Sequence, residues 1–163
     1  MESGAGGNWK RYGERKDASV IQQTTGISCM AAVGQMLLRS REISISQEKI
    51  RDIIGEPADS ATLADALNRF DSSDDSFVWR GLFLEDFEAL RQLLKNPSVG
   101  NIAVVLREPA TSTGHAVMLG GISVEGIVSI QDPFDQTSYE MKEADFDENW
   151  GLEVIARWYP INQ

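Results

Sequence analysis

The first half of the chain repeats apolar residues at the three- and four-residue spacing of amphipathic helices. A helix-capping serine stands at the start of three of these runs, at Ser28, Ser46 and Ser60. A fourth helical run covers 85–94 and follows an extended stretch at 77–84. The pattern therefore predicts that this half of the chain, about 18–98, is mainly helical.

After Pro97 the pattern changes to short β-branched or aromatic runs that are separated by glycine or proline turns. The runs cover 102–106, 116–119, 127–130 and 152–159. Because almost no helical segment lies between them, they predict a meander of antiparallel strands over about 99–160. Helices first and strands second indicate an α+β fold, with a helical lobe and a sheet lobe that meet at a cleft.

The ends of the chain set the expected domain boundaries. Residues 1–17 are rich in glycine and show no apolar period, which predicts a flexible N-terminal arm. Residues 18–163 are then a single domain, a normal size for one hydrophobic core.

Charge and composition narrow the classes of partner. Of 163 residues, 15 are Lys or Arg and 25 are Asp or Glu, so the net charge is −10. Nucleic acids and anionic membranes attract clustered basic residues, so neither is an expected partner. No apolar run reaches the roughly 20 residues of a membrane span, and no secretory signal opens the sequence. We expect synthesis in the cytoplasm; the oligomeric state stays open.

The single cysteine and single histidine limit the available chemistry. They exclude an intrachain disulfide and a four-ligand zinc site. An acidic cluster lacks the spacing and the glycine of a calcium-binding EF-hand loop, which favours a solvated surface. The cluster comprises Glu143, Asp145, Asp147 and Glu148. No metal or cofactor is expected, and any chemistry by Cys29 is thiol chemistry.

Cys29 lies at the predicted start of the first helix, where unpaired N–H groups and the helix dipole favour an anion. A lone cysteine is often a small core residue, but a helix start lowers the pKa of a thiol and favours a nucleophile. A nucleophilic thiol needs a base, and His115 at the start of a predicted strand is the one imidazole available.

Asp132 follows His115 by 17 residues, after the strand at 127–130. Antiparallel pairing of the two strands through a turn at Gly126 brings this carboxylate beside the imidazole, where it can fix the ring tautomer. Asp135 is the alternative orienting group.

Gln23 stands six residues before Cys29, in a polar loop. Its side-chain amide can donate, together with the Cys29 N–H, to an oxyanion that forms on a carbonyl carbon. The neighbouring Gln22 is the alternative donor.

Three segments together resemble the papain-like cysteine peptidases of bacteria. The first runs from Gln23 through Cys29-Met-Ala-Ala to Met36-Leu-Leu, the second is Gly114-His-Ala-Val-Met-Leu-Gly-Gly, and the third is Ile130-Gln-Asp-Pro. The similarity is greatest to the double-glycine leader peptidases and the related avirulence-type effector proteases, and it covers about 20–158.

The resemblance implies a papain-like fold and a role for each member of the set. Cys29 is then the nucleophile, His115 the general base and acid, Asp132 the residue that orients the ring, and Gln23 the oxyanion donor.

The predicted function is a cysteine peptidase that cuts an extended peptide or protein substrate between the lobes and needs no cofactor. The same triad can act on another acyl group, as an amidase, deamidase or acyltransferase. A peptide-binding module without catalysis is a further alternative. Effector proteases act in a host or target cell, so the resemblance leaves open that this protein is delivered to such a cell.

Overall fold

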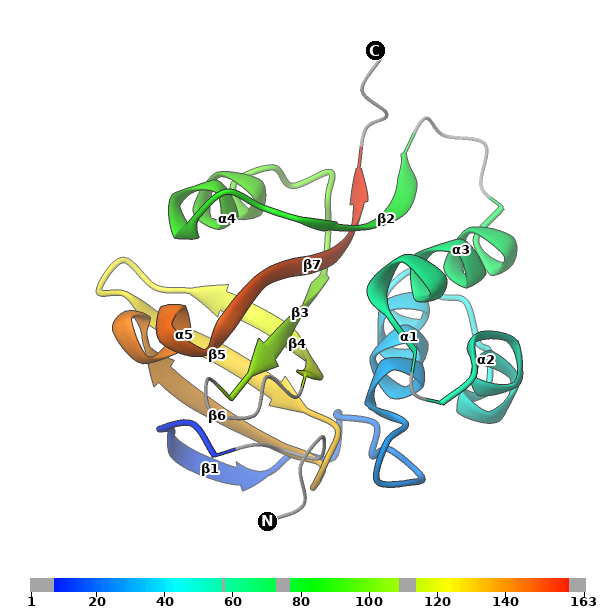
Figure 1. Ribbon diagram of the computed structural model, residues 1–163, viewed down its shortest axis with the longest axis horizontal. Coiled ribbons are helices and arrows are strands. Elements are labelled where there is room, and N and C mark those ends of the chain that lie inside the picture. The colour runs from blue at the N-terminus through cyan, green and yellow to red at the C-terminus, as the bar shows by residue number, and fades with distance from the viewer. Residues whose placement is uncertain (1–7, 57, 73–76, 109–113, 159–163) are drawn as a thin grey trace.

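The computed structural model describes residues 8–56, 58–72, 77–108 and 114–158, which form an α+β fold around one sheet (Figure 1). Its seven strands lie in the order β1-β6-β5-β4-β3-β7-β2, and all neighbours are antiparallel. The strands are β1 (Tyr12–Lys16), β2 (Val78–Phe83), β3 (Ile102–Arg107), β4 (Gly114–Ile122), β5 (Ile127–Asp132), β6 (Thr137–Lys142) and β7 (Trp150–Trp158). The helices are α1 (Cys29–Arg39), α2 (Gln47–Ile54), α3 (Ser60–Phe70), α4 (Phe87–Leu94) and α5 (Glu143–Asn149).

The sheet is covered on both faces (Figure 1). Ala116 and Met118 of β4 pack into a hydrophobic cluster with α1, α2 and α3. The alternate residues Val117 and Leu119 pack into a second cluster with α4 and α5. Because both faces of the central strands are buried, their sequences are apolar without interruption, as in the run over 102–106.

Helices α1, α2 and α3 begin where predicted, but two of the predicted caps need correction. Ser46 caps α2 as predicted, since its side chain accepts the Lys49 N–H at 3.1 Å. Helix α3 is capped by Asp59, one residue before Ser60. Ser28 occupies the N-cap position of α1, but its side chain makes no capping hydrogen bond because the hydroxyl bonds elsewhere.

The described part of the N-terminal segment, from residue 8 onward, belongs to the sheet. The expectation of a flexible arm is therefore wrong for these residues. Residues 12–16 form strand β1, which pairs with β6, and Trp9 is only 5% exposed. Every residue of β1 is exposed, so this edge strand lacks the apolar alternation that reveals a strand in sequence. Residues 1–7 lie outside the described part of the chain.

Helices and strands are more mixed along the chain than the predicted order, with helices in the first half and strands in the second. Strand β2, from the first half, pairs with β7 at one edge of the sheet, as the extended stretch at 77–84 foreshadows. Helix α5, in the second half, has one buried apolar side chain, Phe146, too little for a helical period. Among the helices of the described ranges, none has the length and apolarity to cross a bilayer.

Candidate active site

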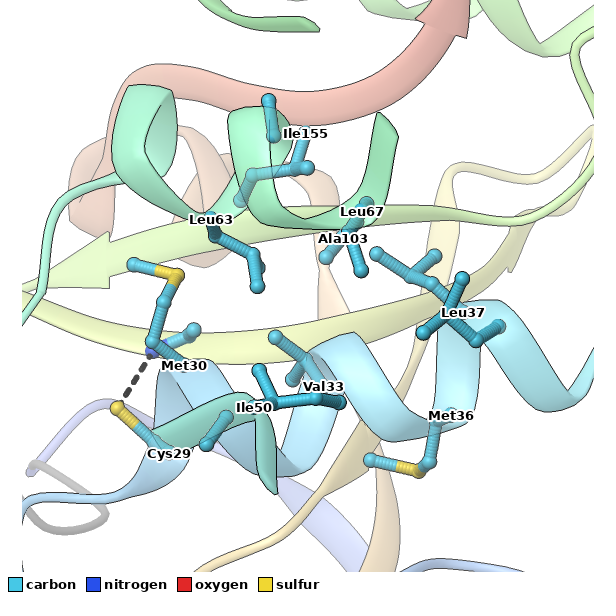
Figure 2. Packing of buried hydrophobic residues seen from close by; sticks show 14 of the residues in the cluster. Cys29, Met30, Val33, Met36, Leu37, Ile50, Leu63, Leu67, Ala103 and Ile155 are labelled. Atoms are coloured by element: carbon cyan, nitrogen blue, oxygen red, sulfur yellow. Dashed lines mark hydrogen bonds between the residues drawn. The ribbon is translucent and has the colours of Figure 1, made fainter. Parts of the chain in front are cut away.

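Cys29 is the first residue of α1 and is 8% exposed. Its side chain lies next to Met30 at one end of the hydrophobic cluster formed by α1, α2 and α3. Leu37 lies at the other end of this cluster (Figure 2). The thiol Sγ accepts a hydrogen bond from the Ala116 N–H at 3.4 Å, the dashed line in Figure 2. The start of α1 is therefore joined to strand β4 directly after His115.

His115 and Asp132 are brought together by the hairpin of β4 and β5. His115 is the second residue of β4, Asp132 is the last residue of β5, and the two strands pair antiparallel. Gly126, in the turn between them, has φ = 85°, a left-handed conformation that favours glycine. Nε2 of His115 lies 2.6 Å from Oδ1 of Asp132, and both side chains are buried.

The carboxylate has two further donors. Oδ1 of Asp132 accepts the Phe134 N–H at 2.9 Å, and Oδ2 accepts the Tyr139 hydroxyl at 2.7 Å. The Tyr139 oxygen in turn accepts the Trp9 indole N–H at 3.0 Å. The Trp9 ring also stacks on His115, with ring centroids 5.9 Å apart and an interplanar angle of 23°. We refer to these four residues, Trp9, Tyr139, Asp132 and His115, as the base network.

Electrostatics in the site favour a thiolate beside an imidazolium. Burial opposes ionisation of Cys29, but its interactions with His115 and the Ala116 N–H outweigh burial and lower the pKa of the thiol. Burial also opposes a charged His115, but the Asp132 carboxylate and, less strongly, Cys29 outweigh burial and raise the pKa of His115 to about 10. Burial likewise opposes the charge on Asp132, and the attraction to His115 outweighs it and lowers the pKa of the carboxyl.

The hydrogen bonds also fix the tautomer of the ring. With Nε2 of His115 against the acceptor-only carboxylate of Asp132, the ring keeps a proton on Nε2. Nδ1 is buried and has no hydrogen-bond partner among the described atoms. It is therefore the nitrogen left for proton exchange with the neighbouring thiol of Cys29.

Burial separates the predicted residues from their alternatives. Gln23 is 6% exposed, whereas the side chain of Gln22 is exposed. Nε2 of Gln23 donates to the Thr25 carbonyl oxygen at 2.8 Å, which uses one of its two N–H groups. Asp132 is buried, and Asp135 is exposed. Gln23 and Asp132 are thus buried, whereas the alternatives Gln22 and Asp135 are exposed.

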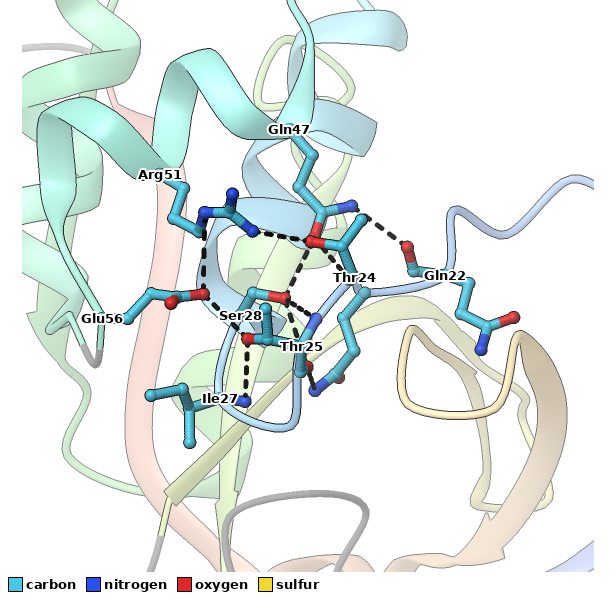
Figure 3. Close-up of polar contacts among 9 residues, drawn as sticks. Gln22, Thr24, Thr25, Ile27, Ser28, Gln47, Arg51 and Glu56 are labelled. Atoms are coloured by element: carbon cyan, nitrogen blue, oxygen red, sulfur yellow. Dashed lines mark hydrogen bonds and ion pairs between the residues drawn. The ribbon is translucent and has the colours of Figure 1, made fainter.

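Sequence analysis does not identify three buried polar partners of the site: Trp9, Tyr139 and Gln47. The weak signals were an aromatic residue in a polar N-terminal segment and a glutamine directly after the capping Ser46. Gln47 contacts the loop that precedes Cys29 (Figure 3).

No group of three or more His, Cys, Asp or Glu side chains is arranged for a metal ion in the parts of the chain that the structure describes. In the acidic cluster, Glu143 forms an ion pair with Arg91 at 2.6 Å.

Solved structures with this fold include two bacterial peptidase domains. The peptidase domain of Streptococcus ComA, a bi-functional ABC transporter involved in a quorum sensing pathway, has a TM-score of 0.69 at 15% identity, over 86% of this chain and 97% of that one. A double glycine motif protease from an AMS/PCAT transporter, in complex with the leader peptide, has a TM-score of 0.67 at 17% identity, over 96% and 98% of the two chains. At these identities the likeness shows a shared fold.

Sequence comparison gives a nearer relative, cysteine protease effector 1 of Escherichia coli O1:K1:H7. It is 35% identical over 151 residues, which are 92% of this chain and 29% of the relative. The chain therefore spans less than a third of that protein's length. The family model of the Peptidase C39 family matches residues 17–159. These findings confirm the predicted resemblance to leader peptidases and effector proteases, while the wider papain-like classification stays a prediction. The chain belongs to the Peptidase C39 family.

Proposed function

We propose that this chain is a cysteine peptidase with Cys29 as nucleophile, His115 as general base and acid, and Asp132 as the residue that orients the ring. The observation that carries the proposal is the buried 2.6 Å contact between His115 and Asp132, beside a thiol whose pKa is lowered. Membership of the Peptidase C39 family supports it.

In the proposed reaction, the Cys29 thiolate attacks the carbonyl carbon of the scissile peptide bond. The carbonyl oxygen takes the negative charge, and the free N–H of Gln23 Nε2 and the Cys29 N–H at the helix start donate to it. His115 gives its Nδ1 proton to the leaving amine as the C–N bond breaks, which leaves a thioester. Water then attacks the thioester carbonyl carbon and gives a proton to Nδ1 of His115. The C–S bond breaks, the carboxylic acid product leaves, and the Cys29 thiolate beside the His115 imidazolium is restored.

The proposed substrate is a peptide or protein segment in extended conformation, bound between a helical lobe and a sheet lobe as in a papain-like fold. Support comes from the solved structure of a double glycine motif protease that holds its leader peptide. Delivery to a target cell is also part of the proposal, and the name of the effector relative supports it.

The test compares the new protein N-termini that wild type and Cys29→Ala produce in a cell lysate. Peptide-bond cleavage creates new N-termini, whereas deamidation of a side chain creates none. We expect N-termini that appear with wild type and are missing with Cys29→Ala. The variant should keep the wild-type circular dichroism spectrum, because the substitution removes one sulfur atom at a helix start and leaves the rest of the fold unchanged. The same set of N-termini with both proteins would contradict the proposal.

A further inference from the structure

We propose that Gln47 is a positioning residue for the oxyanion site, an inference that rests on the proposed function. Gln47 is the first residue of α2 and is 4% exposed. Its side-chain amide bonds to the loop over 22–28, which carries Gln23 at one end and leads into Cys29 at the other (Figure 3).

Both ends of the Gln47 amide are used. Oε1 accepts the Thr24 N–H at 2.9 Å, the Ser28 hydroxyl at 3.0 Å and the Thr24 hydroxyl at 3.2 Å. Nε2 donates to the Gln22 carbonyl oxygen at 3.0 Å. One buried side chain thus fastens the loop before Gln23, after it and at the residue before Cys29. A buried amide that is bonded through both its oxygen and its nitrogen favours one conformation of the loop.

The loop conformation in turn sets the direction of the Gln23 amide. The Thr25 carbonyl oxygen accepts Nε2 of Gln23 at 2.8 Å, and the Thr25 N–H donates to the Ser28 hydroxyl oxygen at 3.0 Å. Gln47 holds that same hydroxyl. Because oxyanion donors act only when their position is correct to about 0.5 Å, releasing this loop should slow the chemical step.

The outer contacts of the loop are exposed and carry less weight. Arg51 donates to the Thr24 hydroxyl at 2.9 Å, and Glu56 accepts the Thr25 hydroxyl at 2.8 Å. Exposed contacts of this kind are screened by water and hold a loop weakly. The buried amide of Gln47 therefore holds the loop more firmly than these exposed contacts do.

Gln47→Glu tests the amide with almost no change of shape. A carboxylate accepts but does not donate, so an ionised Glu at this position would face the Gln22 carbonyl oxygen with no proton between them. A protonated Glu supplies that proton and mimics the amide. Burial, the facing Gln22 carbonyl oxygen and the Glu56 carboxylate favour the protonated form, whereas the Arg51 guanidinium beside the same loop favours the ionised form. The variant should therefore lose activity as the pH rises, through an ionisation that wild type lacks.

The experiment measures kcat and KM between pH 5 and pH 9 for wild type, Gln47→Glu and the control Gln92→Glu. Gln92 is exposed on α4, and its substitution makes the same change in charge. Alkylation of Cys29 by iodoacetamide is measured in parallel, because that reaction needs the thiolate but forms no oxyanion. We expect kcat of Gln47→Glu to match the control at low pH and to fall about tenfold or more at high pH. KM and the alkylation rate should stay within about twofold of the control.

A pH profile of kcat that follows Gln92→Glu overturns the proposal, and so does an alkylation rate that falls in parallel with kcat. Ser28→Ala, which removes one donor to Gln47 and keeps the amide, covers the case in which Gln47→Glu does not fold. Its kcat should fall several-fold at all pH values with KM unchanged, and an unchanged kcat overturns the proposal. Failure of the proposed function is distinct, because wild type and Gln92→Glu would then both lack turnover.

Discussion

The two sides of the proposed active site differ in the interactions that hold them, which are mainly apolar packing around Cys29 and buried hydrogen bonds around His115. Cys29 lies on a helix whose own buried side chains are apolar, such as Val33 and Leu37, and its sulfur accepts a backbone N–H (Figure 2). His115 instead belongs to the base network, in which one buried hydrogen bond follows another.

This contrast predicts different responses to change. Apolar packing is insensitive to pH, and loss of a buried methyl or methylene group costs stability in proportion to the cavity left. A buried polar network depends on the protonation of each member, and removal of one link leaves its partners unpaired. Substitutions in the apolar packing of α1 should therefore affect stability, and substitutions in the base network should affect rate and its pH dependence.

Asp132→Asn should produce the largest loss of rate. Three donors converge on the carboxylate, from His115, Phe134 and Tyr139, and an amide with one oxygen and an NH₂ group cannot accept all of them. The ring then loses its fixed tautomer, so we expect kcat to fall on the order of 10³-fold with little change in KM.

The pH profile of the same variant gives a second measure. The Asp132 carboxylate, together with Cys29, raises the pKa of His115 to about 10, so the imidazolium of wild type persists until the pH approaches that value. Without the carboxylate the pKa of His115 falls, and the high-pH limb of kcat should move to lower pH. A limb that stays in place would show that another group supplies the charge.

Leu37→Ala should reduce stability and leave the chemistry intact. The side chain is fully buried on α1, eight residues beyond Cys29, so its truncation leaves a cavity far from the thiol. We expect the free energy of unfolding to fall by about 2–5 kcal/mol, measured by denaturant titration. The pH dependence of Cys29 alkylation should match wild type; a shifted profile would mean that core packing also tunes the thiol.

Tyr139→Phe should have a moderate effect that depends on Trp9. The substitution removes the donor to Asp132 and leaves the buried Trp9 N–H without its acceptor. We expect a loss of about 1–3 kcal/mol in unfolding free energy, and a fall in kcat of about tenfold. Because Trp9→Phe removes the stranded N–H, the double variant should be less destabilised than the sum of the single ones. Additive losses would argue that the indole and the phenol act separately.

Asp135→Asn should have the smallest effect. This carboxylate is exposed and lies three residues from Asp132. We expect kcat, KM and the pH profile to stay within about twofold of wild type, since exposed single charges contribute little. A large loss of rate would shift the orienting role from Asp132 to Asp135.

The sequence was informative where one physical signal decides the outcome. The spacing from His115 to Asp132 suits an antiparallel hairpin, and the structure pairs the strands with the two side chains in contact. Strand β1 was not predictable, because an exposed edge strand has no apolar period. The roles of Gln47 and Tyr139 were not predictable for a related reason. A buried polar side chain is recognised by its hydrogen-bond partners, and the partners of these two residues lie in elements far away along the chain.

The base network also has a consequence for synthesis on the ribosome. Trp9 leaves the ribosome 130 residues before its hydrogen-bond partner Tyr139. Strand β1 likewise has no neighbour until β6 has emerged. Cys29 and its helix are therefore made before His115, Asp132 and Tyr139. A nascent chain that already carries Cys29 lacks the proposed base and its orienting carboxylate, so the thiol should react as an ordinary free cysteine until the segment from His115 to Tyr139 is made.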